Sequence, residues 1–190
     1  MSAFRNAGFS LIEVLVTILI LMVGLLGLAG LQGRAVTAQM EAYQRSQALI
    51  LLKDMGDRIS ANRHNATAYI TNASGVTPAP RGTGFNGSAV QDCSGFTGSS
   101  LDLCEWHNAL LGAAETQGGA NVGAMIGARG CVYQVTVPAS GVAGEYLVAV
   151  AWQGFNSTAT PAVDCGSGQY GDEAKRRVVT LPVAIADLAP

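Results

Sequence analysis

Charged side chains are scarce in this chain of 190 residues. Asp, Glu, Lys and Arg make up 13% of it, where about 25% is usual for soluble domains. Acidic and basic residues nearly balance, 13 against 11, and the densest basic cluster is only Lys175-Arg176-Arg177. A nucleic-acid-binding surface needs a longer basic stripe, so we expect no nucleic-acid partner. The apolar fraction of 49% argues against intrinsic disorder.

Catalytic and metal-binding motifs are missing as well. The sequence has no phosphate-binding GxxxxGK[ST] loop, no HExxH zinc motif and no GxSxG elbow. Its two histidines, His64 and His107, and its cysteines, none in a CxxC pair, fit a zinc site poorly. Asp164, Asp172 and Glu173 supply only part of the six to eight oxygens that calcium takes. We therefore expect no metal, no cofactor and no enzymatic activity, and we interpret His107 as structural.

The apolar residues are concentrated near the N-terminus. Glu13 carries the one charge between Phe9 and Gly33, and Thr17 is the one polar interruption of Val14–Leu31. As a helix this run spans ~27 Å, close to the ~30 Å hydrocarbon core of a bilayer. A secretory signal peptide has a shorter apolar region, about 7–15 residues, and ends in a cleavage motif of small residues. The run therefore predicts a retained membrane segment.

All four cysteines follow the membrane segment, at Cys93, Cys104, Cys131 and Cys165. An even number in an exported domain indicates disulfides, and three pairings are formally possible. We favour Cys93–Cys104 together with Cys131–Cys165. Disulfides need an oxidising compartment, which predicts a cytoplasmic N-terminus and a body outside the cytoplasm.

One long helix is predicted from about Phe9 to about Asn62, because no proline occurs before Pro78. At this length of ~80 Å, we expect its C-terminal half to pack on the globular body and its N-terminal half to project. An apolar stripe at three- and four-residue steps defines the packing face. The stripe consists of Val36, Met40, Tyr43, Ile50, Leu51, Met55 and Ile59.

Gly24, Gly27, Gly30 and Gly33 repeat every third residue inside this helix. Each costs about 1 kcal/mol of helix stability relative to alanine. The spacing is not GxxxG, which makes a dimerisation face a weak interpretation. Two interpretations of the glycine repeat remain: close approach of neighbouring helices, and a soft segment, meaning a part of the helix that unwinds easily. We favour the soft segment.

The rest of the chain predicts a small sheet. Residues 63–130 are rich in small and polar residues and are expected to be irregular, with a short helix at about Asp102–Gly112. Alternation of period two then predicts three antiparallel strands, with Pro182 at an edge or an interruption. The strands are Cys131–Val137, Tyr146–Trp152 and Val178–Ile185. The predicted fold class is α+β, a long N-terminal helix packed on a small antiparallel sheet that spans residues 131–190.

The string Gly8-Phe9-Ser-Leu-Ile-Glu13-Val-Leu, after a leader with Arg5, closely resembles the class III signal of type IV pilins and pseudopilins. The resemblance implies that a membrane-embedded prepilin peptidase and N-methyltransferase removes residues 1–8 and methylates Phe9. From the residues alone, Ser10 and Glu13 also fit a capping box, and a glutamate in the first turn suits the helix dipole.

The same resemblance implies separate roles for the two halves of the helix. Residues 9–33 would form the transmembrane half that also mediates assembly, and residues 34–62 would form the amphipathic half. Glu13 would meet the N-terminal amine of a neighbouring subunit, and Gly24–Gly33 matches a region that loses helicity in filaments. The implied location is the inner membrane, in a single pass with a periplasmic body, and later the pilus fibre or its tip.

Residues 131–190 resemble the PilV family of minor pilins in a Cys-led strand, the strand Tyr146–Gly154, the later Cys165 and a basic run before the last strand. This resemblance implies a subunit that joins other minor pilins, the major pilin and the inner-membrane assembly platform to initiate assembly. Arg34 and the basic run would lie at subunit contacts or on a solvated face. The alternatives are a minor pseudopilin of a type II secretion system and, from another class, a single-pass anchored periplasmic binding domain.

Overall fold

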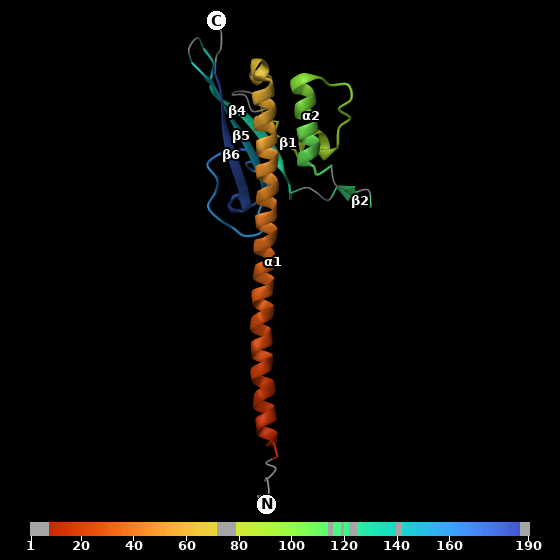
Figure 1. Ribbon diagram of the computed structural model, residues 1–190, viewed down its shortest axis with the longest axis vertical. Coiled ribbons are helices and arrows are strands. Elements are labelled where there is room, and N and C mark those ends of the chain that lie inside the picture. The colour runs from red at the N-terminus through yellow and green to blue at the C-terminus, as the bar shows by residue number, and fades with distance from the viewer. Residues whose placement is uncertain are drawn as a thin grey trace, which may run out of the picture. The chain divides into compact units, whose positions relative to one another are not determined.

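The structure is a computed structural model. The chain divides into two compact units, and the boundary between them lies after Ala42 in the sequence. Helix α1 (Leu11–Ala61) contributes to both units, and the remaining elements belong to the second (Figure 1). The leader residues 1–7, including Arg5, lie outside the described part of the chain. The residues described are 8–71, 79–113, 116–118, 120–121, 125–139 and 142–186.

The first unit contains the apolar part of α1. Every side chain from Phe9 through Val36 is exposed in the isolated chain. By length and composition, α1 is the one helix among the described residues that could cross a membrane, and its most apolar window has a mean hydropathy of 2.8. The helix is continuous through Gly24–Gly33, and a Cβ added at any of its four glycines would meet no atom within 4 Å. The expected softness therefore stays a prediction about the assembled state.

The observed bounds of α1, Leu11–Ala61, lie within two residues of the predicted helix. Part of the predicted packing face is wrong, because Val36, Met40, Tyr43 and Ile50 are each about half exposed or more. The buried face instead begins at Gln44 and runs through small residues as well as large ones. Its members are Gln44, Ala48, Leu52, Met55, Gly56 and Ile59.

Close approach of the sheet explains why small residues lie on that face. A Cβ added at Gly56 would come within 2.7 Å of Leu181 Cδ2. Ala48 on the same face is fully buried. The sequence prediction relied on the spacing of large apolar side chains. The contact between α1 and the sheet instead requires small side chains at its centre, because the two elements pack closely there.

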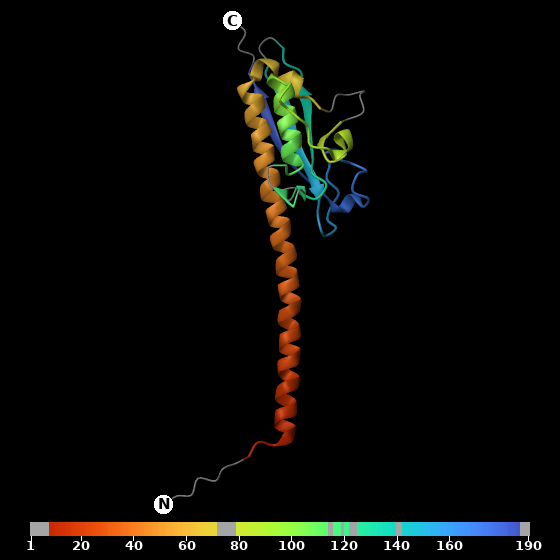
Figure 2. The same ribbon diagram turned by 90° about the vertical axis from the view of Figure 1, so that its right-hand side faces the viewer.

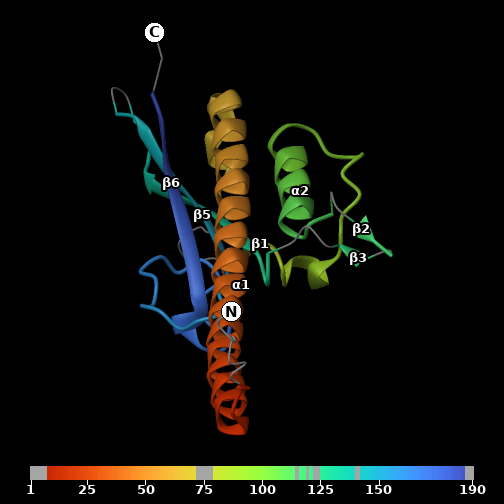
Figure 3. The same cartoon turned by 60° about the horizontal axis from the view of Figure 1, so that its bottom comes forward.

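The sheet is antiparallel throughout, with strand order β1-β4-β5-β6. Strand β6 lies at one edge, where Pro182 pairs with Leu147 of β5 (Figure 3). The predicted α+β class, a long helix on a small antiparallel sheet, is confirmed. The strands are β1 (Arg81–Gly82), β4 (Arg129–Thr136), β5 (Gly144–Gln153) and β6 (Arg176–Ile185).

Short elements fill the region between α1 and β4. Helix α2 (Gly98–Leu110) begins four residues before the predicted short helix, and β1 pairs with β4. A second, two-stranded sheet was not predicted; it consists of β2 (Thr116–Gln117) and β3 (Ala120–Asn121). Three 3-10 helices complete the described elements: η1 (Arg63–Tyr69), η2 (Phe85–Ser88) and η3 (Glu173–Lys175).

Both faces of the central strand β5 are buried. Val148, Val150 and Trp152 pack in the main core, together with residues from α1 and α2. The alternate residues Ala149 and Ala151 face a second cluster on the other side of the sheet. That cluster also contains Cys131, Cys165 and Tyr170. Figure 2 shows the C-terminal part of α1 and α2 side by side on one face of the sheet.

Trp106 of α2 connects the two helices to the sheet. Its side chain is fully buried, and its indole Nε1 donates a hydrogen bond to the Leu51 carbonyl of α1 at 2.9 Å. The ring lies directly on Gly130 of β4, where an added Cβ would overlap Cη2 and come within 2.6 Å of Cζ3. Glycine at this position therefore sets the distance between α2 and the sheet.

We expect Gly130→Ala to lower the free energy of unfolding by about 1–3 kcal/mol, because the methyl group displaces a fully buried indole. Thermal unfolding of the detergent-solubilised chain, followed by tryptophan fluorescence, measures this as a lower Tm. Gly95→Ala is the matched control, since a Cβ there meets nothing within 4 Å. Equal melting temperatures for the two variants would contradict the role of Gly130.

Candidate functional site

The N-terminal signature lies at the very start of α1. Gly8 and Phe9 precede the helix and have no regular secondary structure, and Phe9 is 85% exposed. The Ser10 carbonyl accepts the first helical hydrogen bonds, from the amides of Glu13 at 3.0 Å and Val14 at 3.3 Å. The peptide bond between Gly8 and Phe9 is therefore accessible, and Glu13 lies in the first turn of the helix.

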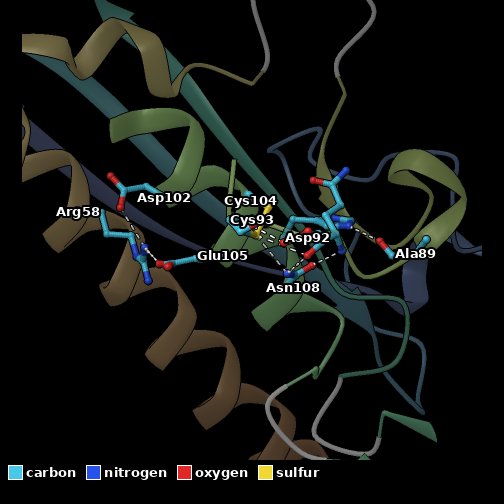
Figure 4. Close-up of a disulfide and its surroundings, with 11 residues drawn as sticks. Arg58, Ala89, Asp92, Cys93, Asp102, Cys104, Glu105 and Asn108 are labelled. Atoms are coloured by element: carbon cyan, nitrogen blue, oxygen red, sulfur yellow. Dashed lines mark hydrogen bonds and ion pairs between the residues drawn. A yellow bond between two sulfur atoms is a disulfide. The ribbon is translucent and has the colours of Figure 1, made fainter. Parts of the chain in front are cut away.

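A charge cluster joins α1 to α2 in the second unit (Figure 4). Arg58 of α1 donates through Nη1 to Asp102 at 3.0 Å and to Glu105 at 2.6 Å, and through Nε to Asp54 at 3.1 Å. Burial alone would lower the pKa of Arg58, but the hydrogen bonds to Glu105 and its other carboxylate partners more than offset this and raise the pKa. The Tyr69 hydroxyl of η1 donates to Asp102 as well. These contacts hold the end of α1, η1 and α2 together.

Two disulfides stabilise the loops of the second unit. Cys93 is bonded to Cys104 of α2, and Cys131 of β4 is bonded to Cys165, with Cα atoms 5.8 Å and 5.9 Å apart. These are the pairings that the sequence analysis favoured. Asn108 supports the first one, because its side chain accepts from the Gln91 amide and donates to the Gln91 carbonyl, both at 2.8 Å (Figure 4).

His107 has a structural role in the described contacts. It is fully buried, and its Nδ1 accepts a hydrogen bond from the Gly82 amide at 2.9 Å. Its Nε2 lies 2.9 Å from the Ala89 carbonyl, so Nε2 carries the proton and donates. Through these two bonds His107 holds β1 and the segment before Gln91 against α2. Within the described ranges, no group of three or more His, Cys, Asp or Glu side chains could hold a metal ion.

The acidic loop residues that the sequence offered as partial cation ligands bind protein donors instead. Asp164 accepts from the Tyr133 hydroxyl at 2.5 Å. Asp172 accepts from the Ala174 amide and the Ser157 hydroxyl. Glu173 accepts from the Gly168 amide at 2.7 Å and from Arg176 at 2.6 Å. Among the residues that the structure describes, these three carboxylates do not form a group that could hold a metal ion.

The basic run Lys175-Arg176-Arg177, whose two arginines begin β6, is partly internal, which corrects its interpretation as a subunit contact or a solvated face. Arg176 is 2% exposed and donates to the carbonyls of Pro161, Val163 and Cys165. Arg177 donates to the Thr158 hydroxyl at 2.7 Å. The sequence pattern could not show this, because both arginines take most of their partners from a loop 11 to 21 residues away.

Sequence reasoning also missed a cavity of about 590 Å³ in the second unit. It is bounded by the segment before and within η2, by the start of β4 and by the loop at Asp164–Gln169. Arg129, at the start of β4, is its one buried charged residue. No motif marks this residue in the sequence, since its neighbours in space are distant along the chain.

Two family models match the chain. The prokaryotic N-terminal methylation motif matches residues 4–29, a range that includes Gly8, Phe9 and Glu13. A model described as type IV pilin Tt1218 matches residues 30–95, which contain the rest of α1 and the chain as far as Gly95. No curated protein and no solved structure matched the chain significantly.

The buried position of His107 predicts a pH dependence of stability. Burial lowers the pKa of His107 below its ordinary value of 6.5. The unfolded chain therefore binds a proton below about pH 6.5 while the native state does not, so stability falls on acidification, by up to ~1.4 kcal/mol per pH unit, until the lowered native pKa is reached. Denaturant unfolding between about pH 7 and pH 5 should show this slope in wild type.

The matched pair of variants for this measurement is His107→Gln and His64→Gln. His64 is exposed, so its replacement should leave the slope unchanged. An equal slope in wild type and His107→Gln would contradict the assignment of the pH dependence to His107.

Proposed function

We propose that this chain, a protein of the type IV pilin family, is a minor pilin that takes part in priming pilus assembly. The observation that carries the proposal is the order of features at the N-terminus. Gly8 and Phe9 lie outside the helix, Glu13 follows in the first turn, and an uncharged, exposed helical run continues to Gly33. The match to the N-terminal methylation motif covers most of this arrangement.

Processing at Gly8 is the first step of the proposal. A glycine before the bond leaves the backbone open to close approach, and the exposed Phe9 side chain offers a recognisable group after it. Cleavage by the prepilin peptidase removes residues 1–8, and the same enzyme methylates the new amine of Phe9. The product is a helix whose positive amine lies close ahead of Glu13.

Glu13 then selects a partner in the membrane. A carboxylate near the centre of a bilayer costs ~2.5–3.5 kcal/mol, so it is stable there only with a compensating charge or hydrogen-bond donor. In the proposal this partner is the Phe9 amine of a neighbouring subunit. Removing one member of such a pair leaves the other charge without a partner, so the pair fixes the axial register while the apolar helices supply contact area.

The two disulfides support the orientation. Both lie in the second unit, and disulfides persist in oxidising compartments, so we place this unit in the periplasm and the N-terminus in the cytoplasm. The subunit starts in the inner membrane and passes into the fibre or its tip. Gly24–Gly33 would lose helical structure in the fibre, since each glycine weakens the helix by about 1 kcal/mol.

The resemblance of residues 131–190 to PilV-type minor pilins favours a priming role with other minor pilins, the major pilin and the assembly platform. A minor pseudopilin of a type II secretion system would use the same N-terminal chemistry, and the neighbouring genes distinguish the two systems. A simple anchored periplasmic binding domain would keep its leader. The mass of the mature N-terminus therefore separates the anchored binding domain from both the minor pilin and the pseudopilin.

Gly8→Ala is expected to block processing, so the variant keeps residues 1–8 and an unmodified Phe9. Intact-mass analysis of the membrane-extracted chain measures both changes at once. Gly24→Ala is the control, because it is also exposed but lies outside the cleavage site. If wild type and Gly8→Ala have equal N-termini, cleavage does not occur at Gly8.

Glu13→Gln is expected to leave cleavage intact and to reduce incorporation into pili at least about tenfold, because the amine of the neighbouring subunit loses its partner charge. The amount of subunit in sheared pilus fractions, relative to the membrane pool, measures incorporation. Glu41→Gln, farther along the same helix, is the matched control. Unchanged incorporation of Glu13→Gln would contradict the assembly role and would indicate that Glu13 only caps the helix.

A further inference from the structure

The cavity at the start of β4 has the dimensions of a ligand site. Its volume of about 590 Å³ falls within the range of roughly 300–1,000 Å³ that small-molecule pockets occupy. Its walls come from three separate parts of the second unit, and the Cys131–Cys165 disulfide joins two of them. The pocket is therefore held open by covalent and sheet contacts.

Arg129 brings a positive charge into this pocket. The residue is 7% exposed, and its guanidinium lies 4.8 Å from the centre of the Tyr170 ring. Its Nη1 donates to the Gly127 carbonyl at 3.1 Å. Across the described part of the chain, no carboxylate lies within ion-pairing distance of Arg129. Arg176, which is also buried, differs because it pairs with Glu173.

One end of the Arg129 guanidinium lies beside the wall of the cavity at Gly84. Its Nη2 lies 3.8 Å from the position that a Cβ would take at Gly84, and Gly84 lines the pocket. On the opposite wall, a Cβ at Gly166 would come within 3.2 Å of Arg129 Cδ and 2.9 Å of Tyr170 Cε2. The two glycines, both at positive φ, leave room for the arginine to reach the cavity.

A second arginine adds positive charge beside the pocket. Arg81 lies 4.1 Å over the ring of Phe85, which lines the cavity. Its Nε is buried, and no described atom accepts a hydrogen bond from it. A buried charge without a counter-charge is unfavourable, and an anion in the pocket would relieve it for Arg129, which lines the pocket. Asp164 is the one carboxylate in the lining, and it already accepts from Tyr133.

The remaining walls fit a hydroxylated ring. Phe85 and Pro80 offer flat apolar surface, and four neutral side chains offer both donors and acceptors. These are Thr83, Asn86, Ser167 and Gln169. We propose that this pocket binds a polyhydroxylated carboxylate of the uronic acid class, with the carboxylate on the guanidinium of Arg129. The inference does not depend on the assembly role, since α1 and Glu13 take no part in the pocket.

Calorimetric titration of the full-length, detergent-solubilised protein tests the proposal with glucuronate, glucose and inorganic phosphate. Glucuronate is expected to bind saturably, and glucose at least about tenfold more weakly, because glucose lacks the carboxylate that makes a charge-assisted hydrogen bond with Arg129. Phosphate has the charge without the hydroxylated ring and should also bind more weakly. Equal binding of phosphate would show a general anion site, and equal binding of glucose would remove the role of the carboxylate. Either result overturns the proposal, as does the absence of glucuronate binding.

Two variants locate the binding. Arg129→Gln is expected to weaken glucuronate binding at least about tenfold, while Arg45→Gln, an exposed arginine on α1, should not change it. Because Arg129 is buried, Ser167→Trp serves as a second variant, which fills the cavity from an exposed position in its lining. Glucuronate affinity at the wild-type level in Ser167→Trp, or in a folded Arg129→Gln protein, would overturn the assignment to this pocket.

Discussion

Glu13 is the one charge in 25 residues from Phe9 to Gly33, and this constraint governs the proposed function. In water the Glu13 carboxylate is solvated, because it is exposed in the first turn of α1, and the helix dipole stabilises its negative charge. In a membrane the same carboxylate requires a cation, and the apolar run of α1 contains none. An amine created by cleavage after Gly8 would supply that charge from another subunit. In the proposed function, cleavage after Gly8 creates this ion pair, and membrane position and assembly depend on it.

The second unit meets a different constraint, since a small sheet must bury both of its faces. On one face, Trp106 lies on Gly130, and Gly56 lets α1 approach Leu181. On the other face, the Cys131–Cys165 disulfide covers the alanines of β5. The disulfides also shorten the loops of the unfolded chain, which contributes ~2–4 kcal/mol each in small domains. The stability of this domain therefore rests on burial of both faces of the sheet and on the disulfides.

The buried and partly buried arginines of this domain are of two kinds. Arg58 and Arg176 each pair with carboxylates and hold segments together, so their charges are neutralised within the chain. Arg129 stacks on Tyr170 and lines a cavity, and no ion pair joins it to a described residue. The first arrangement stabilises the fold, whereas the second is suited to an external anion. This contrast supports the proposed ligand pocket, which is separate from helix α1.

Local patterns in the sequence determined the long helix, the three main strands and the edge position of Pro182, because each follows from spacing along the chain or from proline chemistry. The signature around Gly8 was identified in the sequence by its resemblance to a known signal. Only the tertiary structure decided which face of α1 is buried, where close approach favours Ala48 and Gly56 over Ile50. It likewise decided that Arg176 is internal and that Arg129 lines a cavity. These outcomes depend on contacts between segments far apart in the chain, and side-chain volume and charge compensation at such contacts leave no periodic trace in the sequence.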